Sequence, residues 1–491
     1  MLRRPLTLAI ALAVALPAFA ADERTALTLY RADSDQLFAT NGDAVSGDGY
    51  AVVHERRAFN LTGGTQDLSI GGLPSALDSE ALSLRFPGKG AHVVSQRLLL
   101  GQGFDAAVNG LVGHDVTVIG SSGQPIASGK LVHGGDALVL RDPNNGTSVV
   151  KEYAALHVTD AAEIARGSTL QVRVTGGSAG QTAAQLDYPT SGLGWRGAYV
   201  ATLAPGNTCR MSFDASASIA NRSGRDWKDV SLKLVAGDAN RAKAAPQPKM
   251  FMARAMAAPA PMAAGMEDAM PEQATLGDLR TYSLPTAVDL PDGSVTQTPL
   301  YDSRTIDCER ESIYDANGGM GYIPPRPRME REMGLPNSTP VVSRVSFKAF
   351  DSLPAGYVRV LTADRDGNAE LLGEGRIDDT PKNKQAIVTL GNAFDLRATR
   401  EQTAFTASAP EHRIDESIRL TFTNAGKDAR VVTVHEHPNR WRAWTVTSSS
   451  IKPTKTNPEQ LEFKVTVPAG GTATLDYSVR YTWTDNDLSK D

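Results

Sequence analysis

The sequence predicts an all-β protein in which a small barrel-like module is followed by β-sandwich domains, the last of them immunoglobulin-like. Two observations carry this prediction. Apolar and polar residues alternate with period two along most of the chain, as they do on half-buried strands. Gly (44) and Pro (28) are plentiful among 491 residues while aromatics make up only 6%, which is typical of short strands joined by tight turns. The length allows about three domains, at about 150 residues each.

The first twenty residues have the order of features found in an export signal. Arg3 and Arg4 precede an apolar run over residues 6–16, and small residues then favour cleavage between Ala20 and Ala21. An uncleaved membrane anchor is the alternative, but the run is about half of the ~20 residues that a spanning helix needs. We therefore expect a periplasmic or secreted protein with a signal peptide over residues 1–20 and no membrane span after its removal.

The charge balance narrows the class of partner. The full chain carries 50 basic and 55 acidic residues, a net charge of −5, and loss of the two arginines in the signal makes it about −7. Nucleic-acid and anionic-lipid partners call for basic patches. The composition therefore argues against both.

The predicted N-terminal β domain covers residues 21–165. Strands in its second half become shorter and turns more frequent, with Ser121-Ser122-Gly123 and Gly134-Gly135-Asp136 among the connections. About five strands in about fifty residues indicate a small closed barrel over residues 109–159, because closure removes exposed strand edges.

A central β-sandwich is predicted over residues 166–317, followed by a linker over residues 318–340. Its strands are interrupted at residues 239–275, where Ala, Pro and Met follow one another without a period and prolines prevent a continuous helix. We interpret this insertion as a long disordered loop. The remaining C-terminal β region, residues 341–491, contains strand and turn spacing typical of an immunoglobulin-like sandwich at residues 414–483.

Several phrases of the mature chain resemble a known family, the mucoidy inhibitor A-like exported proteins with a C-terminal domain of unknown function. The phrases are Leu186-Asp187-Tyr188, Gly194-Trp195-Arg196, Asn221-Arg222-Ser223-Gly224-Arg225-Asp226-Trp227, Leu290-Pro291-Asp292-Gly293, Leu353-Pro354-Ala355-Gly356, Ile377-Asp378-Asp379-Thr380-Pro381 and Val467-Pro468-Ala469-Gly470. The chain resembles a short form, because it lacks the coiled coil of longer relatives. The resemblance implies an exported β-rich protein and transfers no catalytic residue.

Three fragments match enzyme or ligand motifs by letter but not by context. Residues 192–197 have the glycine spacing of a dinucleotide loop, and residues 176–180 that of a nucleophile elbow, yet each motif must lead into a helix and here strands follow. Residues 364–368 resemble the start of a calcium loop, but Gly375 stands where the bidentate Glu is required. A hairpin turn is the simpler interpretation of that fragment, and we expect no cofactor.

His435 and His437 are the candidate metal ligands. Residues two apart on a strand face the same way, so both imidazoles could reach one zinc or copper ion. No third ligand can be identified, and Pro438 ends the strand beside them. We favour an exposed strand end over a metal site.

Trp441, Arg442 and Trp444 lie together in the last block. An exposed aromatic beside Arg would suit a sugar or protein partner. The alternative, which we favour, is that the tryptophans belong to the sandwich core.

Cys209 and Cys308 are the only cysteines, in a chain predicted to enter an oxidising compartment. Each is in phase with apolar neighbours, which places both in one core. A disulfide and two unpaired buried thiols both remain open, because the sequence does not give the Cα separation.

We expect a non-catalytic envelope protein that binds another envelope component, a protein or a glycan, or serves as a structural module. The second hypothesis is a metal-dependent hydrolase acting on an envelope polymer. An enzyme would bring several carboxylates or histidines with perturbed pKa values together in one pocket.

Overall fold

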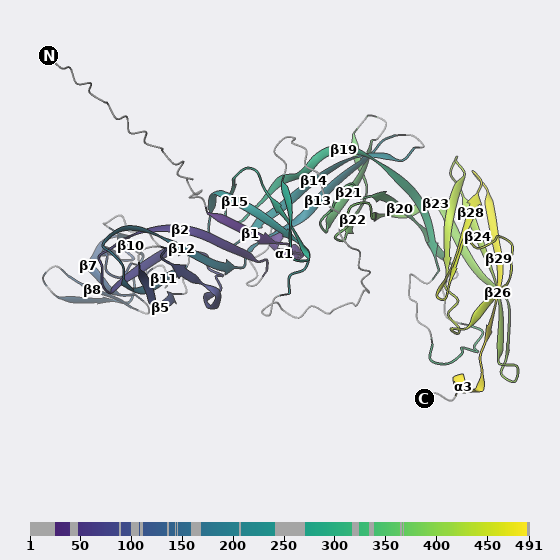
Figure 1. Ribbon diagram of the computed structural model, residues 1–491, viewed down its shortest axis with the longest axis horizontal. Helices are drawn as coiled ribbons and strands as arrows, with labels where there is room; N and C mark the ends of the chain where they lie inside the picture. Colours follow the sequence, from purple (N-terminus) through teal and green to yellow (C-terminus); the bar gives the residue numbers. More distant parts are fainter. Residues whose placement is uncertain are drawn as a thin grey trace, which may run out of the picture.

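In the computed structural model, the described residues are 25–39, 48–87, 90–99, 108, 111–134, 137–142, 144, 146–158, 168–205, 208–240, 271–316, 324–332, 338–363, 366 and 368–488. The predicted signal peptide with its cleavage point lies outside this set, as do residues 241–270 of the predicted insertion. The described chain is almost entirely β-structure arranged in several sheets, as the sequence predicts (Figure 1).

The first sheet has eight strands, which come from residues 26–85 and from residues 180–290. Its order is β16-β17-β15-β1-β2-β12-β4, with β18 paired to β15. β1 alternates apolar and polar residues, buries Leu27 and Leu29, and lies parallel to β15 and antiparallel to β2. The bounds are β1 Ala26–Tyr30, β2 Ala51–Leu61, β4 Ser83–Arg85, β12 Gly180–Thr190, β15 Trp227–Ala236, β16 Glu272–Leu276, β17 Leu279–Ser283 and β18 Val288–Leu290.

The predicted C-terminal limit of the disordered insertion, residue 275, is wrong. Residues Glu272 to Thr275 belong to β16, which pairs with β17 as a hairpin across Gly277 and Asp278. Gly277 has a φ of +61°, the conformation that this turn requires. The hairpin partner supplies backbone hydrogen bonds that the apolar pattern of the segment alone did not reveal.

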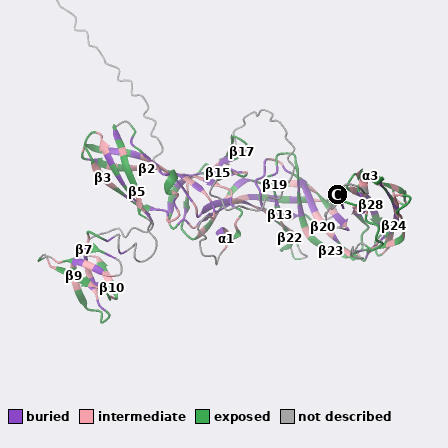
Figure 2. Cartoon of the chain, turned by 90° about the horizontal axis from the view of Figure 1, so that it is seen from below, coloured by how far each residue is buried: buried purple, intermediate pink, exposed green. Residues whose placement is uncertain are grey.

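A five-stranded sheet forms a separate module with its own small core. Its strands are β6 Asp115–Ile119, β7 Pro125–His133, β8 Leu138–Arg141, β9 Thr147–Val150 and β10 Ala155–Val158. Val116, Val118, Leu131, Leu138 and Leu140 are buried at its centre. Figure 2 shows this module beside the sheets that contain β2, β3 and β5.

The prediction that this module is a closed barrel is wrong. The sheet order is β10-β6-β7-β8-β9, and within the described residues its terminal strands β9 and β10 do not pair. Closure requires strands to tilt and to stagger along the barrel. Strands of four residues, as β9 and β10 are, offer too little length for that stagger.

The module follows β5 and precedes β11 in the chain. These two strands pair in a three-stranded sheet of order β3-β11-β5, with bounds β3 Gln66–Leu73, β5 Ala91–Leu99 and β11 Ser168–Gly176. β11 and β12 flank the glycine-rich residues 176–180 but belong to different sheets. That segment therefore turns the chain from one sheet to the next and is not a hairpin between paired strands.

The largest sheet has thirteen strands and continues from the central region into the C-terminal region (Figure 1). Its path is β22-β21-β13-β14-β19-β20-β23-β24-β29-β26, with β25, β27 and β28 attached through β19. The bounds are β13 Leu193–Leu203, β14 Arg210–Asn221, β19 Ser294–Asp315, β20 Ser338–Lys348, β21 Gly356–Ala363, β22 Ala369–Ile377, β23 Gln385–Ser408, β24 Arg413–Asn424, β25 Arg430–Glu436, β26 Trp444–Ser449, β27 Lys455–Asn457, β28 Gln460–Val467 and β29 Thr472–Thr482.

Two long strands connect two large cores. The first core joins residues of the N-terminal and central sheets, including Leu29, Trp195 and Phe213, so it is continuous across the expected boundary near residue 166. The second lies inside the C-terminal sandwich around Phe422 and Phe463. β19 and β23 have 22 and 24 residues and extend from one core to the other.

Helical structure in the described chain is short: α1 Asp35–Phe38, η1 Ser79–Ala81 and α3 Asp485–Leu488. Among the described residues, none of these helices has the length and apolar character needed to cross a bilayer.

Candidate functional site

A cleft of about 570 Å³ lies between β2, β3 and the turn that joins β14 to β15. Arg57 and Phe59 of β2, Gly71 and Gly72 of β3, and Arg225 of the turn contribute to its walls. Cavities of a few hundred Å³ with a few polar groups are the usual form of a binding site. We take this cleft as the candidate functional site.

The turn at the cleft is held by its own side chains. Asn221 donates from Nδ2 to the carbonyl oxygens of Arg225 and Leu290, each at 2.8 Å, and its Oδ1 accepts from the backbone and hydroxyl of Ser223. Trp227 donates from Nε1 to Ser223 Oγ at 3.0 Å. Gly224 has a φ of +77°, which a residue with a Cβ rarely adopts. This phrase of the sequence therefore builds a fixed turn.

Asp292 connects the turn to the segment between β18 and β19. Its Oδ1 accepts from the backbone of Gly224 at 2.9 Å, and its own backbone N–H donates to Asp226 Oδ1 at 2.8 Å. Both aspartates line the cleft. Two phrases that carry the family resemblance, about seventy residues apart, thus form one wall.

A buried carboxylate lies beneath the cleft. Glu55 is 3% exposed and its oxygens lie 2.6 Å from Arg225 Nη1 and 2.7 Å from Arg57 Nη2. The buried Tyr188 also donates its hydroxyl to Glu55. Arg225 donates from Nη1 to the Tyr188 hydroxyl at 3.0 Å and stacks on the Trp227 ring, 4.2 Å from its centroid. Glu55, Tyr188 and Trp227 thus position the guanidinium together.

The electrostatics of this group fix its protonation. Burial tends to raise the pKa of Glu55, but the Arg225 and Arg57 charges outweigh burial and hold that pKa below its ordinary 4.5. Burial, together with the Glu55 charge, raises the pKa of Tyr188 well above its ordinary value. Near neutral pH the carboxylate stays ionised and the phenol stays protonated. The arrangement is suited to holding the two arginines at the cleft and not to transferring protons.

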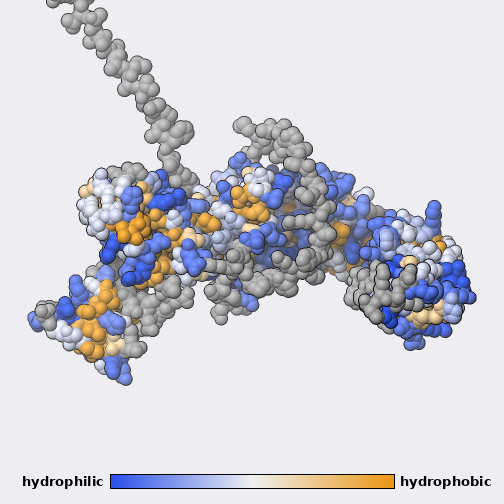
Figure 3. Space-filling model, turned by 60° about the horizontal axis from the view of Figure 1, so that its bottom comes forward, coloured by the Kyte–Doolittle hydropathy of each residue, from blue (hydrophilic) through white to orange (hydrophobic). Residues whose placement is uncertain are grey.

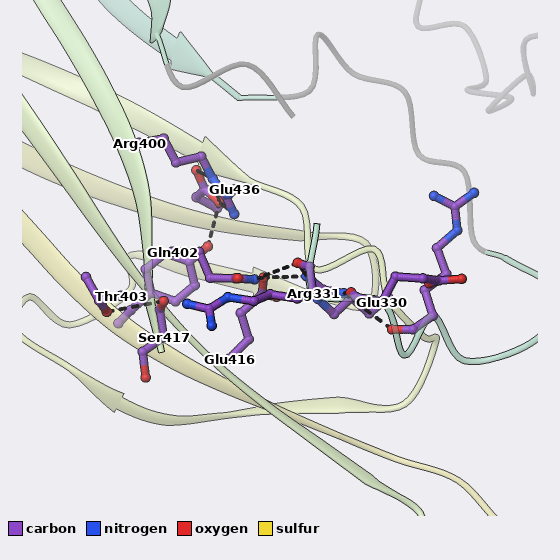
Figure 4. Close-up of polar contacts among 11 residues, drawn as sticks. Glu330, Arg331, Arg400, Gln402, Thr403, Glu416, Ser417 and Glu436 are labelled. Carbon is purple, nitrogen blue, oxygen red and sulfur yellow. Dashed lines mark hydrogen bonds and ion pairs between the residues drawn. The ribbon is translucent and has the colours of Figure 1, made fainter. Parts of the chain in front are cut away.

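A second buried network lies in the C-terminal sandwich (Figure 4). Arg440, 1% exposed, binds both oxygens of Glu416 at 2.9 and 3.0 Å. It also donates to the backbone carbonyls of Arg328, Glu330 and Arg331. Part of the predicted linker, residues 324–332, is thereby attached to the sandwich.

Beside it, Arg400 contacts both oxygens of Glu436 at 3.2 to 3.3 Å, and Tyr477 donates its hydroxyl to the same carboxylate. Burial tends to lower the pKa of Arg400, but the Glu436 charge, the hydrogen bond to Glu436 and the Tyr477 and Glu416 groups together outweigh burial and raise it. Gln402, between the two pairs on β23, donates to Glu416 at 2.6 Å and to Arg331 O at 3.3 Å. Each buried charge here has a charged partner and further hydrogen bonds, which is the condition for tolerating it in a core.

His435 and His437, the predicted candidate metal ligands, are each beside a different carboxylate. His435 Nε2 lies 3.7 Å from Glu462 and His437 Nε2 lies 3.4 Å from Asp315. Burial lowers the pKa of His435, whereas Asp315 raises that of His437. Within the described residues, no three His, Cys, Asp or Glu side chains are grouped as metal ligands.

The aromatic segment near the C-terminus belongs mainly to the core. Trp441 is 2% exposed and packs in the C-terminal core, and the Arg442 guanidinium lies 4.6 Å from its ring centroid. Trp444 is half-buried and donates from Nε1 to Pro458 O at 3.0 Å. The favoured prediction, that the tryptophans of this segment belong to the sandwich core, is thus confirmed for Trp441.

Cys209, directly before β14, and Cys308 on the neighbouring strand β19 form a disulfide, with their Cα atoms 5.0 Å apart. Cys308 also donates its backbone N–H to Cys209 O at 3.0 Å. Both residues pack against the first core. The bridge joins positions 99 residues apart, on either side of the predicted insertion.

Exposed apolar side chains occur on the N-terminal modules. Figure 3 shows hydrophobic surface over these sheets. Among their residues, Val94 of β5, Ile126 and Val132 of β7 and Val149 of β9 are 44% to 61% exposed. Single exposed residues of this kind are common on protein surfaces.

The sequence analysis missed the buried glutamates of the described chain, Glu55, Glu416 and Glu436, although a signal was present. Glu55 continues the inward positions of Ala51 and Val53, and Glu436 continues those of Val432 and Val434. A charged residue at an inward position of an alternating strand predicts a buried ion pair. Its partner cannot be found from the strand, because Arg225 is 170 residues from Glu55.

Comparisons with known proteins identify a family but no function. A search of the curated proteins found no match. The family model described as a domain of unknown function, DUF4139, matches residues 184–485, which is more than half of the chain and includes the Asn221–Trp227 turn, the central strands and the C-terminal sandwich. The chain therefore belongs to the DUF4139 family.

Proposed function

We propose that this protein is an exported component of the cell envelope that acts by binding, without catalysis, and that the cleft beneath which Glu55 lies is its binding site. The partner is another envelope component, a protein or a glycan. Export rests on the order of charged, apolar and small residues in segment 1–20. The resemblance to the mucoidy inhibitor A-like proteins, in a short form without the coiled coil, supports the same location.

The observation that carries the binding role is the state of Glu55. Its carboxylate is held ionised by Arg57 and Arg225, and Tyr188 is held protonated. A general acid or base needs a pKa near the working pH. Glu55 stays ionised and Tyr188 stays protonated, and in these forms they hold the arginines of the cleft wall in place. Phe59, Arg57 and Arg225 offer aromatic and cationic surface to a partner.

Site-specific photo-cross-linking in living cells tests this proposal. Ser69 is exposed on β3 and lines the cleft, and Ser448 is exposed on β26, far along the molecule. With a photoreactive residue at position 69 we expect one discrete cross-linked adduct, recovered in the periplasmic or the secreted fraction. With the photoreactive residue at position 448 we expect no such adduct. Equal labelling at both positions, or no adduct at 69, contradicts the binding role of the cleft.

A matched variant separates loss of binding from loss of folding. Asp226→Asn changes a wall residue of the cleft but keeps an acceptor for the Asp292 backbone. We expect it to reduce the adduct at position 69 while the thermal midpoint changes by no more than about 2 °C. Mass spectrometry of the mature protein, expected to begin at Ala21, tests the export step separately.

A further inference from the structure

A second cavity, of about 320 Å³, lies where the chain passes from the central core to the C-terminal core. We call it the junction cavity. Its walls come from β13, β19, β20, β22, β23 and β25. None of its lining residues is shared with the cleft that carries Arg57 and Arg225.

A bulge in β23 forms part of the wall of the junction cavity. β20 pairs Pro340 with Arg397 and Val342 with Asn392, so one residue of β20, Val341, faces residues 393–396 of β23. A bulge bends its strand and redirects side chains, and bulges are frequent beside functional sites. Here it turns Ala393 and Leu396 into the C-terminal core and leaves Phe394 85% exposed.

The apolar part of the lining comes from both sides of the bulge. Leu203 belongs to the first core and Leu390 packs against it, whereas Leu396 belongs to the second core, inside the C-terminal sandwich. Leu372, 41% exposed, and Phe394 complete an apolar rim. The Arg397 guanidinium lies 5.9 Å from the centroid of the Phe394 ring, and the ring is otherwise open to an apolar ligand beside the cavity.

The polar part of the lining is mainly cationic. Arg310, Arg344 and Arg430 line the cavity with two acids, Glu311 and Asp395, so the local charge is positive in an acidic protein. Arg430 donates to Ser312 Oγ at 2.9 Å. Arg344 Nε is buried and has no hydrogen-bond partner among the described residues. A buried N–H of this kind is costly unless a ligand supplies the acceptor.

We propose that the junction cavity binds a small anionic amphiphile, a ligand with an apolar chain and one carboxylate or phosphate head. Guanidinium groups bind carboxylate and phosphate oxygens through paired hydrogen bonds. The leucines and Phe394 take the apolar chain. The net negative charge of the whole chain disfavours binding to an anionic membrane surface. Binding a single anionic head group requires only the arginines of the cavity. The head can come from a fatty acid or from a lysophospholipid.

Calorimetric titration of the purified mature protein tests the proposal. The probes are laurate, a dodecanoyl lysophosphatidylglycerol, uncharged dodecyl maltoside and inorganic phosphate, each below its micellar concentration. We expect one site for laurate, for the lysophospholipid or for both, with a Kd below about 1 mM. Binding of only one identifies the head group. Equal affinity for dodecyl maltoside or for inorganic phosphate, or no binding of either anionic probe, overturns the proposal.

Two variants and a control locate the site. Arg344→Gln should weaken binding about tenfold, and Phe394→Ser should weaken it for the long-chain probes. Arg419→Gln, an exposed arginine paired with Asp476 elsewhere on the C-terminal sheet, should leave binding unchanged. If Arg344→Gln does not fold, the exposed Arg310→Gln replaces it. Unchanged affinity in a folded arginine variant of the cavity contradicts the site.

Discussion

Two buried networks in this protein have the same chemistry and different surroundings. Under the cleft, Glu55 is bound by Arg57, Arg225 and Tyr188; in the C-terminal sandwich, Glu416 is bound by Arg440 and Gln402. The arginines of the first network also form the wall of an open cleft. The arginine of the second is covered by residues 324–332, whose carbonyls it binds. The same ion pair can thus support a binding surface or attach a segment of chain.

The largest predicted effect comes from breaking the closed network. Arg440→Met leaves Glu416 buried without its charged partner and should reduce the free energy of unfolding by about 3–5 kcal/mol. It should also release residues 324–332, so that trypsin cleaves at Arg328 or Arg331. Urea unfolding and limited proteolysis measure the two effects.

The double variant Arg440→Met with Glu416→Gln serves as the control. It removes the uncompensated charge and should recover part of the lost stability while the segment stays released. If the single variant is as stable and as resistant to trypsin as the original protein, Arg440 does not attach this segment.

The second prediction concerns the disulfide, which lies in the first core and not in the second. Cys209→Ser with Cys308→Ser opens a loop of 99 residues and should cost about 2–4 kcal/mol. The loss should appear in the unfolding of the first core, and calorimetry with separate probes for each core would show it. Thiol titration of the denatured, unreduced original protein should find no reactive group; two reactive groups would contradict the bridge.

The third prediction concerns the pH dependence of the network under the cleft. The pKa of Glu55 is lowered in the folded state, so its contribution to stability is present above 4.5, its ordinary value, and is lost as the pH falls through the folded pKa. Glu55→Gln should cost about 1–3 kcal/mol at pH 7 and should flatten the decline in stability below pH 4.5. Urea unfolding from pH 7 to pH 3 measures this difference. Parallel curves for the two proteins would show that Glu55 is not held ionised by its arginines.

The smallest effect is expected at the predicted insertion. β15 pairs with β17, and β17 with β16, so the strands on either side of residues 241–270 belong to one sheet. Replacing those residues with a short Gly-Ser connection changes the closure entropy by about 0.6 kcal/mol per halving of length, and the melting temperature should stay within a few degrees. An alternative hypothesis is that the Met-rich stretch binds a partner, Met being suited to irregular contacts.

The two hypotheses for the insertion differ in partner capture. Under the first, the shortened protein still forms the adduct at position 69; under the second, it folds normally and loses the adduct. Unfolding of the shortened protein would contradict both and would mean that the segment is a packed element.

Local pattern was sufficient for much of the fold. The alternation in segments such as Ile414–Phe422 gave the strands, and the glycine-rich steps gave the turns. It failed where the pairing of one segment with another, near or distant in the chain, decides the outcome. The open order of the five-stranded sheet depends on β10 pairing with β6, and β16 forms because β17 lies beside it. The residues of one strand do not indicate which other strand it will pair with.

The sequence by itself determined the all-β class and the shared core position of the two cysteines, because the side-chain period acts over a few residues. Only the tertiary structure decided that Glu55 meets Arg225, that Cys209 meets Cys308, and that β23 bulges between two cores. These outcomes depend on contacts between residues up to 170 positions apart, which form only when the sheets assemble and bury the charged side chains together.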